Sequence, residues 1–390
     1  MNEQKQSTIW NIILAATGIF ASLAVIVLIS GIISRQTVEP APTEPPAPTE
    51  PASYTIMDNF ESQVADALTK ANASALSVKK RFWIEEDAEI APLPNPACYG
   101  ETNDPASLQW LLDEAAEILD GQETIFRTDV ELVHDSLITY YLDESIFVIT
   151  WQEVRDNFVY TYSEVKISDP SQFRRHLANN EYNSDYMHPV SRMGNMVNAV
   201  MASSADYYRG RNHGIIVYEG EVKRADYSEL VDTCFIDKNG DMILVPAGEL
   251  ITVEEAQKFV DDNDIDFSLA FGPILVDNGQ RCEPANYYLG EVNDNYPRAA
   301  LCQKDDLHYI VVVANGHLYH WDRPDIHTFA KWIEELDCEK AYTLDGGKTG
   351  TIAMQGRALN PTQGPERWIS DIIYFATAIP SSATNENDAT

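Results

Sequence analysis

The sequence predicts an α+β protein. Its main part is a β-rich, mixed-sheet domain of catalytic type with packed helices, preceded by a small α+β region, a proline-rich stalk and one N-terminal transmembrane helix. Three observations support this: an uncharged run at the N-terminus, a Pro/Thr/Glu-rich stretch after it, and short apolar runs separated by hairpin signals further on. The predicted divisions are a tail at 1–8, an anchor at 9–33, a linker at 34–53, an α+β region at 54–157, the main domain at 158–379 and a disordered tail at 380–390.

The run IWNIILAATGIFASLAVIVLISGII predicts a retained membrane anchor. A helix of these 25 residues covers roughly 38 Å, enough to span a bilayer with some tilt. A cleaved signal peptide is the alternative, but its apolar part is normally shorter and ends at a small-residue A-x-A site, which does not occur before Arg35. Lys5 and Arg35 flank the run on opposite sides, so the positive-inside count leaves its orientation open.

The stretch that follows the anchor, TVEPAPTEPPAPTEPAS, predicts a semi-rigid stalk. Its alternating Pro, Thr, Ala and Glu cannot form a core and favour extended polyproline conformations. Such a stalk suits a folded domain that stands off a membrane surface.

Charge and cysteine content exclude some classes of partner. The chain has 61 acidic and 27 basic residues and a net charge of -34, so its main body repels nucleic acid and anionic lipid. Five cysteines without a C-x-x-C pair argue against a zinc site. One or two disulfides, or buried thiols, would account for them, and both interpretations stay open. The oligomeric state is open as well.

Periodicity predicts the order of the elements. In the α+β region, helices are expected at 60–76 and 105–121 and strands at 144–151 and 157–165. The main domain carries hairpin signals at Glu219-Gly220, Asn239-Gly240, Asn278-Gly279 and Asn315-Gly316. Helices are expected between the hairpins at 171–179, about 190–199, 253–263 and 325–337.

The segment AYTLDGGKTGT, residues 341–351, is the first candidate for chemistry. It is expected to form a buried strand that ends at Asp345, followed by Gly346 and Gly347. Glycines let a backbone approach a ligand closely and direct N–H groups at an anion. A simple turn is the alternative, because Asp and Gly favour turns for local reasons.

Basic residues elsewhere suit an anionic ligand. VMASSADYYRGRNHG contains Asp206, Arg209, Arg211 and His213, which combine guanidinium forks for phosphate oxygens with a group that titrates near neutrality. Two further arginines are candidates for the same ligand: Arg298, which heads the apolar strand PRAALC, and Arg367 near the C-terminus.

Taken in order, several motifs resemble the phosphodiester glycosidase domain family over roughly residues 158–378. They are MASSADYY, GIIVYEGEV, FGPILVDNGQ, PRAALC, ELDCEKAYTLDGGKTGT and GRALNPTQGPERWISDIIYF. The resemblance implies a hydrolase that converts a sugar-1-phosphodiester of a cell-envelope or exopolysaccharide glycan to free sugar and a phosphomonoester. It also implies an extracytoplasmic main domain and no required cofactor.

The resemblance implies a role for each candidate residue. Arg298, with Arg209 or Arg211, would hold the phosphate, and the amides around Gly346 and Gly347 would add donors. Asp345 or Asp206 would activate water or stabilise positive charge on the sugar ring, and the two could exchange roles. His213 could share proton transfer.

The chain departs from the family pattern at four positions. Ser204 and Thr343 replace asparagines, Lys348 replaces a glycine, and Thr349 replaces a serine but keeps its hydroxyl. Lost amide contacts would each cost on the order of 1–3 kcal/mol of transition-state binding, whereas Lys348 could supply a new phosphate contact. The alternative function is therefore a non-catalytic member that binds glycans or sugar phosphates, with Ser204 and Lys348 as the positions that separate the two.

A metal site is not predicted. DKNGD places Asp237, Asn239 and Asp241 on alternate residues, but without a bidentate Glu a hairpin turn is favoured over a calcium loop. The histidines of HLYHWDRPDIH do not follow the H-E-x-x-H zinc pattern. A bound calcium or magnesium ion near the acids stays open, and its ligands are unknown.

Overall fold

The computed structural model describes residues 82–282, 290–315, 323–362 and 364–380. All of them belong to one compact unit, Lys79–Thr390. The predicted anchor, the linker and the helix at 60–76 lie outside the described residues, as does the C-terminal tail from residue 381. Within the described ranges, no helix is both long enough and apolar enough to cross a membrane.

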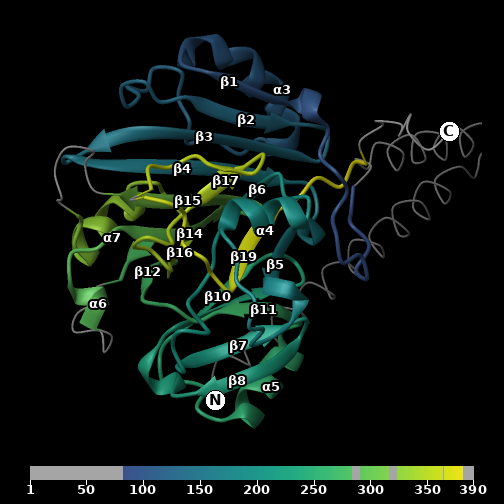
Figure 1. Cartoon of the computed structure of the whole chain (residues 1–390), viewed down its shortest axis with the longest axis vertical. Coiled ribbons are helices and arrows are strands. Elements are labelled where there is room, and N and C mark those ends of the chain that lie inside the picture. Colours follow the sequence, from purple (N-terminus) through teal and green to yellow (C-terminus); the bar gives the residue numbers. More distant parts are fainter. Residues whose placement is uncertain (1–81, 283–289, 316–322, 363, 381–390) are drawn as a thin grey trace, which may run out of the picture. The chain divides into compact units, whose positions relative to one another are not determined.

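The largest element is a nine-stranded sheet with the order β1-β2-β3-β4-β15-β14-β16-β12-β13 (Figure 1). Its described strand pairings are all antiparallel, whereas the sequence predicted mixed sheets. Tight hairpins join consecutive strands such as β3 and β4, and a hairpin produces only antiparallel neighbours. The strands span Tyr99–Thr102 (β1), Ile138–Leu142 (β2), Ile146–Arg155 (β3), Phe158–Ile167 (β4), Ile274–Asp277 (β12), Gln280–Arg281 (β13), Arg298–Asp305 (β14), His308–Asn315 (β15) and Lys340–Leu344 (β16).

The border predicted between residues 157 and 158 lies in the hairpin between β3 and β4. These strands pair along their whole length, from Ile146 opposite Ile167 to Arg155 opposite Phe158. β4 also pairs with β15. The two predicted regions therefore contribute strands to one continuous sheet.

The second sheet has five strands in the order β18-β17-β6-β19-β5. β6 lies between β17 and β19 and ends at Ser204, next to the segment that carries Asp206. The strands span Phe173–Leu177 (β5), Met201–Ser204 (β6), Ile352–Met354 (β17), Arg357–Ala358 (β18) and Asp371–Phe375 (β19).

The helix predicted at 171–179 is wrong. Pro170–Gln172 form a short 3-10 turn capped by Asp169, and β5 follows it and pairs with β19. The strand places Arg175 in a buried cluster of charges, where its guanidinium has partners. This tertiary pairing outweighs a local pattern that is compatible with a helix.

The other predicted helices inside the described ranges are confirmed. They are α3 (Gln109–Leu119), α4 (Val190–Met196), α5 (Val253–Asp262) and α7 (Ile326–Glu334). α5 begins with a capping box between Thr252 and Glu255. α7 is capped by the Asp325 carboxylate, which accepts the Thr328 N–H at 2.7 Å, and α7 packs against β12, β13 and β14.

Two small sheets complete the described unit. One has the order β10-β9-β11, and the other is the pair β7–β8, which α5 contacts (Figure 1). The hairpins predicted at Glu219-Gly220 and Asn239-Gly240 join β7 to β8 and β9 to β10, and the one at Asn278-Gly279 joins β12 to β13. The strands span Gly214–Tyr218 (β7), Glu221–Asp226 (β8), Thr233–Asp237 (β9), Met242–Val245 (β10) and Ile265–Leu269 (β11).

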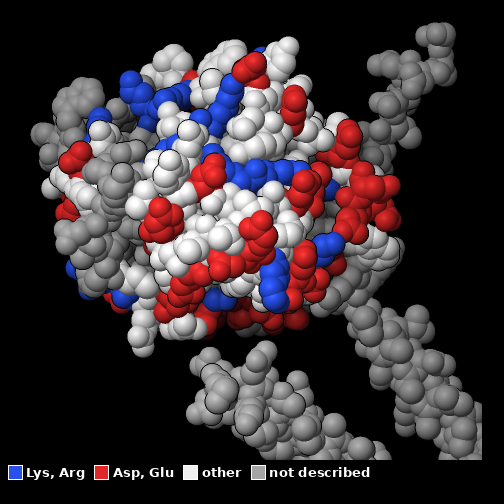
Figure 2. All heavy atoms as spheres, turned by 90° about the horizontal axis from the view of Figure 1, so that it is seen from below, with Lys and Arg blue, Asp and Glu red and all other residues white. Residues whose placement is uncertain are grey.

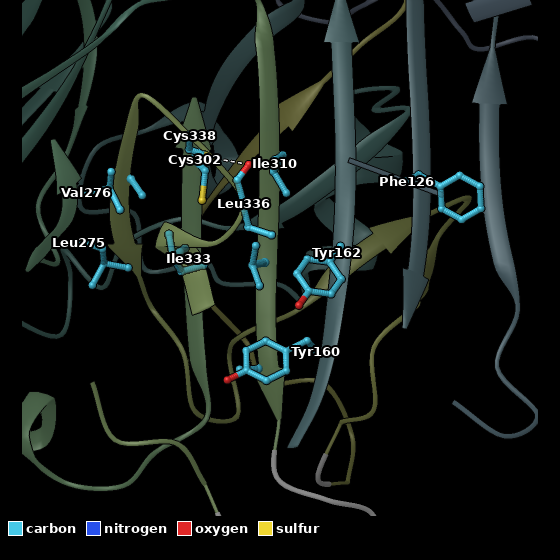
Figure 3. Close-up of a cluster of buried hydrophobic side chains, with 14 of the residues drawn as sticks. Phe126, Tyr160, Tyr162, Leu275, Val276, Cys302, Ile310, Ile333, Leu336 and Cys338 are labelled. Atoms are coloured by element: carbon cyan, nitrogen blue, oxygen red, sulfur yellow. Dashed lines mark hydrogen bonds between the residues drawn. The ribbon is translucent and has the colours of Figure 1, made fainter. Parts of the chain in front are cut away.

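The nine-stranded sheet buries an apolar core on the face that α3 and α7 cover. Figure 3 shows Tyr160 and Tyr162 of β4 and Ile310 of β15 among the side chains of this core. Cys302 and Cys338 lie in the same core, and all five cysteines of the chain are free thiols. On the face shown in Figure 2, Asp and Glu side chains lie among uncharged residues and several Lys and Arg.

Candidate active site

The loop after β16 is fixed to the end of β6. The Asp345 N–H donates to the Ala205 carbonyl at 2.9 Å, and the Ser204 hydroxyl donates to the Asp345 carbonyl at 3.1 Å. Both main-chain groups of Asp345 are thus held by the strand that precedes Asp206. Ser204 stabilises the backbone here and does not line the cavity described below.

The two glycines bring this loop against the start of β14. A Cβ at Gly346 would overlap the Pro297 carbonyl oxygen and lie 3.1 Å from the Arg298 Cα. Gly347 has a φ of +62°, which favours glycine, and its N–H donates to the Pro297 carbonyl at 2.8 Å. The glycines therefore permit close backbone packing, and the Gly347 amide binds the protein's own carbonyl.

A cavity of about 690 Å³ opens beside this loop. Of the predicted site residues, it brings together Arg211, Arg298, Asp345, Gly346, Gly347, Lys348 and Arg367. The remaining lining residues are Tyr207, Phe271, Val292, Tyr296, Pro297, Arg323, Thr343 and Leu344. Five cationic side chains and one carboxylate thus line the described part of the cavity, in a chain whose net charge is -34.

Asp345 supplies that carboxylate. Burial raises its pKa to about 6, while the neighbouring Thr349 hydroxyl and the charges of Arg211 and Arg367 act in the opposite direction. The nearby charge of Asp206 adds to the increase. Asp345 is therefore ionised at neutral pH but is a stronger base than an ordinary aspartate, which suits proton abstraction from water.

Two arginines near Asp345 are positioned by aromatic rings. The Arg211 guanidinium carbon lies 4.2 Å from the centroid of the Phe271 ring. The Arg367 guanidinium carbon lies 5.7 Å from the Tyr207 ring centroid, and its Nη2 lies 3.5 Å from the Tyr207 hydroxyl. Arg211 is buried, whereas Arg367 is exposed.

Arg298 forms part of the cavity wall. Its guanidinium donates to the main-chain carbonyls of Val292, at 3.0 Å, of Pro324, at 3.4 Å, and of Asp294. Burial lowers its pKa to about 10, so it still carries its charge at neutral pH. These bonds tie the start of β14 to the segments on either side of it.

Asp206 belongs to a buried charge cluster and does not line the cavity. Its carboxylate lies 3.0 Å from Arg175 Nη2, which also lies 2.6 Å from the Asp371 carboxylate. Asp206 also accepts the N–H groups of Tyr208, at 2.8 Å, and Ala270, at 2.9 Å. Burial and the neighbouring Asp206 raise the pKa of Asp371.

Three other predicted residues lie outside the cavity lining. Arg209 pairs with the exposed Asp185 at 2.6 Å. The His213 ring packs against Tyr227, with centroids 5.5 Å apart. Thr349 is buried, and its hydroxyl donates to the Gly346 carbonyl, which closes the turn after Asp345.

Sequence analysis missed Arg323, Tyr207, Phe271 and Tyr296 as lining residues, and Arg175 as the centre of the buried cluster. Tyr207 directly follows Asp206 in the motif MASSADYY, so this motif could have indicated Tyr207 as a lining residue. Phe271 begins the predicted hairpin FGPILVDNGQ and Arg175 lies in the segment predicted as a helix, and only the pairing of distant strands brings them here.

Among the described residues, no group of three or more His, Cys, Asp or Glu side chains could hold a metal ion. The DKNGD segment forms the β9–β10 turn, in which the Asp237 carboxylate accepts the N–H groups of Asn239, at 2.9 Å, and Asp241, at 2.8 Å. This is the predicted hairpin. His317 and His320 lie outside the described residues.

Comparison with known proteins finds solved structures and a family model that are similar to parts of this chain. Among solved structures, the zebrafish N-acetylglucosamine-1-phosphodiester alpha-N-acetylglucosaminidase catalytic domain, auto-inhibited by its pro-peptide, is 14% identical with a TM-score of 0.47, covering 67% of this chain and 92% of that one. A hypothetical protein from Synechocystis is 13% identical with a TM-score of 0.44, covering 64% of each chain. No curated protein matches the chain significantly. Residues 195–376 match the model of the phosphodiester glycosidase family, so over this segment the chain is similar to a family of glycoside hydrolases.

Proposed function

We propose that this chain is a membrane-anchored, extracytoplasmic phosphodiester glycosidase. It would hydrolyse a sugar-1-phosphodiester of a cell-envelope or exopolysaccharide glycan to free sugar and a phosphomonoester. The family match and one observation support this proposal: a cavity with five cationic side chains around the single carboxylate of Asp345, in an otherwise acidic chain. Such a cavity attracts an anionic substrate and offers one group that can accept a proton.

The reaction breaks the bond between the anomeric carbon and the phosphate oxygen. The bonding electrons leave with the phosphomonoester, which needs little protonation because a phosphate is a good leaving group. Arg211 is buried, so its charge acts strongly on the departing phosphate. A water oxygen bonds to the anomeric carbon, and the water proton passes to the Asp345 carboxylate.

The carboxylate that accepts the water proton is that of Asp345 and not that of Asp206. Asp206 is engaged by Arg175 and two main-chain N–H groups, and it does not line the cavity. Asp345 lines the cavity and has a pKa of about 6. Activity should therefore fall as the pH decreases through about 6.

The test uses the purified full-length protein and a panel of sugar-1-phosphodiesters, with released sugar as the readout. Asp345→Asn should lower kcat by about 10²–10⁴, while circular dichroism shows an intact fold. Asp185→Asn, an exposed change outside the cavity, is the matched control and should keep wild-type activity. Absence of sugar release from every substrate, or full activity in Asp345→Asn, would disprove the proposal.

The alternative is a module that binds sugar phosphates without turnover. Asp345 is the one carboxylate among the described lining residues, whereas glycosidases commonly use two. Saturable binding of sugar phosphates with no sugar release would favour this alternative.

The membrane location in the proposal rests on residues 9–33 and the stalk after them. Protease treatment of intact cells should release a fragment that contains the main domain. Recovery of the whole chain in the soluble fraction would exclude a retained anchor.

A further inference from the structure

The cationic side chains of the cavity differ in depth. Arg211 and Arg298 are 9% and 4% exposed, whereas Lys348 and Arg367 are exposed. Both buried guanidinium groups also donate to main-chain carbonyls, Arg298 to that of Val292 and Arg211 to that of Phe271. Lys348 and Arg367 are thus the two solvent-exposed cations of the described lining, called the outer pair below, whereas Arg323 is half-buried.

One phosphodiester carries one negative charge, and together with the Asp345 carboxylate it balances the two buried guanidinium groups of Arg211 and Arg298. An exposed cation contributes less than a buried one to an anion bound deeper in the cavity, because water and salt screen it. The same cations can pair directly with an anionic group that reaches the mouth. No acid other than Asp345 is present among the described lining residues to neutralise the outer pair.

The outer pair shows two further features that suit a ligand. Arg367 is held against the Tyr207 ring, so less side-chain entropy is lost when it binds an anion. Lys348 follows the turn at Gly346 and Gly347 that packs against Pro297, so its backbone is fixed at the cavity wall. Gly347, directly before it, fixes the turn from which Lys348 extends.

We infer that the substrate of this cavity carries a second anionic group beyond the scissile phosphodiester, and that Lys348 and Arg367 bind it. This inference rests on the proposed function, since it assigns the scissile group to the Arg211 end. The substrate class is then a polyanionic glycan, with phosphate or carboxylate on the unit next to the one released. A neutral glycan with a single phosphodiester would leave the outer pair unused.

Calorimetric binding of matched ligands to the full-length protein tests the inference without turnover. The ligands are the monophosphates and bisphosphates of 1,3-propanediol and 1,6-hexanediol, which offer one or two anionic groups at two spacings. At least one bisphosphate should bind about tenfold or more tightly than its monophosphate. Dicarboxylate analogues of the same lengths show whether the outer pair accepts carboxylate as well as phosphate.

Variants assign the effect to the outer pair. Lys348→Gln and Arg367→Gln should remove most of the bisphosphate advantage and change monophosphate affinity by less than about threefold, whereas Arg211→Gln should weaken both ligands. Lys238→Gln, which affects a lysine paired with Glu86 outside the cavity, is the control and should leave both affinities unchanged.

The outcomes separate this inference from the proposed function. Two results would overturn the inferred second anionic group and leave the proposed function in place. One is equal affinity for the monophosphate and the bisphosphate, and the other is an equal loss of affinity for both ligands in the Lys348→Gln and Arg367→Gln variants. Failure of every phosphate ligand to bind would overturn the phosphate site itself, and with it the proposed function.

Discussion

Arg175 and Asp206 form an ion pair that is completely shielded from solvent, with Nη2 and Oδ2 separated by 3.0 Å and both side chains 0% exposed. Neither residue of the pair lines the cavity. Asp206 also holds the Tyr208 and Ala270 N–H groups. Tyr207 directly precedes Tyr208 and Phe271 directly follows Ala270, and both Tyr207 and Phe271 line the cavity. The buried Asp206 carboxylate therefore positions two lining residues through the main chain of their neighbours.

Asp206→Asn should destabilise the fold by about 3 kcal/mol, because it removes one partner of a buried ion pair. Urea unfolding followed by circular dichroism measures the change. Asp185→Asn breaks the exposed pair with Arg209 and should cost less than about 1 kcal/mol. Similar losses in the two variants would contradict the role assigned to the buried pair.

Charge changes around Asp345 should move its pKa in opposite directions. Asp206→Asn removes a negative charge that raises the pKa and should lower it, whereas Arg211→Gln removes a positive charge that lowers the pKa and should raise it. Carboxylate ¹³C chemical shifts of Asp345, recorded against pH, report the value directly. Shifts of the same sign in both variants would rule out this electrostatic account.

Asp345→Asn should stabilise the folded protein at neutral pH. The pKa of Asp345 is raised by burial from 3.8 to about 6, so ionisation costs folding free energy once the pH exceeds the unfolded value. The gain of the variant over the wild type should be absent below pH 4, grow between pH 4 and 6 and stay constant above, reaching about 3 kcal/mol. Thermal unfolding at several pH values measures it, and a gain that does not depend on pH would point to another cause.

Gly346→Ala should be much more harmful than Gly347→Ala. A Cβ at 346 would overlap the Pro297 carbonyl oxygen, so the backbone must move, at a cost of about 1–3 kcal/mol. A Cβ at 347 meets no atom within 4 Å, and only its φ of +62° is unfavourable, by about 1 kcal/mol. Unfolding free energies compare the two, and equal losses would show that the close approach to Pro297 is not limiting.

Local patterns predicted most strands, the hairpin turns and the helices α3, α4, α5 and α7, because hydrophobic period and turn residues act over a few positions. They also identified Asp345 and the glycines after it, since a strand followed by Asp-Gly-Gly is visible in one short segment. The helix predicted at 171–179 failed because pairing with β19 and the buried partners of Arg175 outweigh the local preference.

The sequence by itself determined the acidic character of the chain, its β-rich order and the list of basic and acidic residues suited to a phosphate. Only the tertiary structure decided which of them meet. It brings Arg211, Arg367 and Lys348 to the cavity with Asp345, and it buries Asp206 against Arg175. The reason is physical: a carboxylate's surroundings depend on strands far apart in the chain, and whether it meets an arginine or an open cavity decides whether it stabilises the fold or takes part in chemistry.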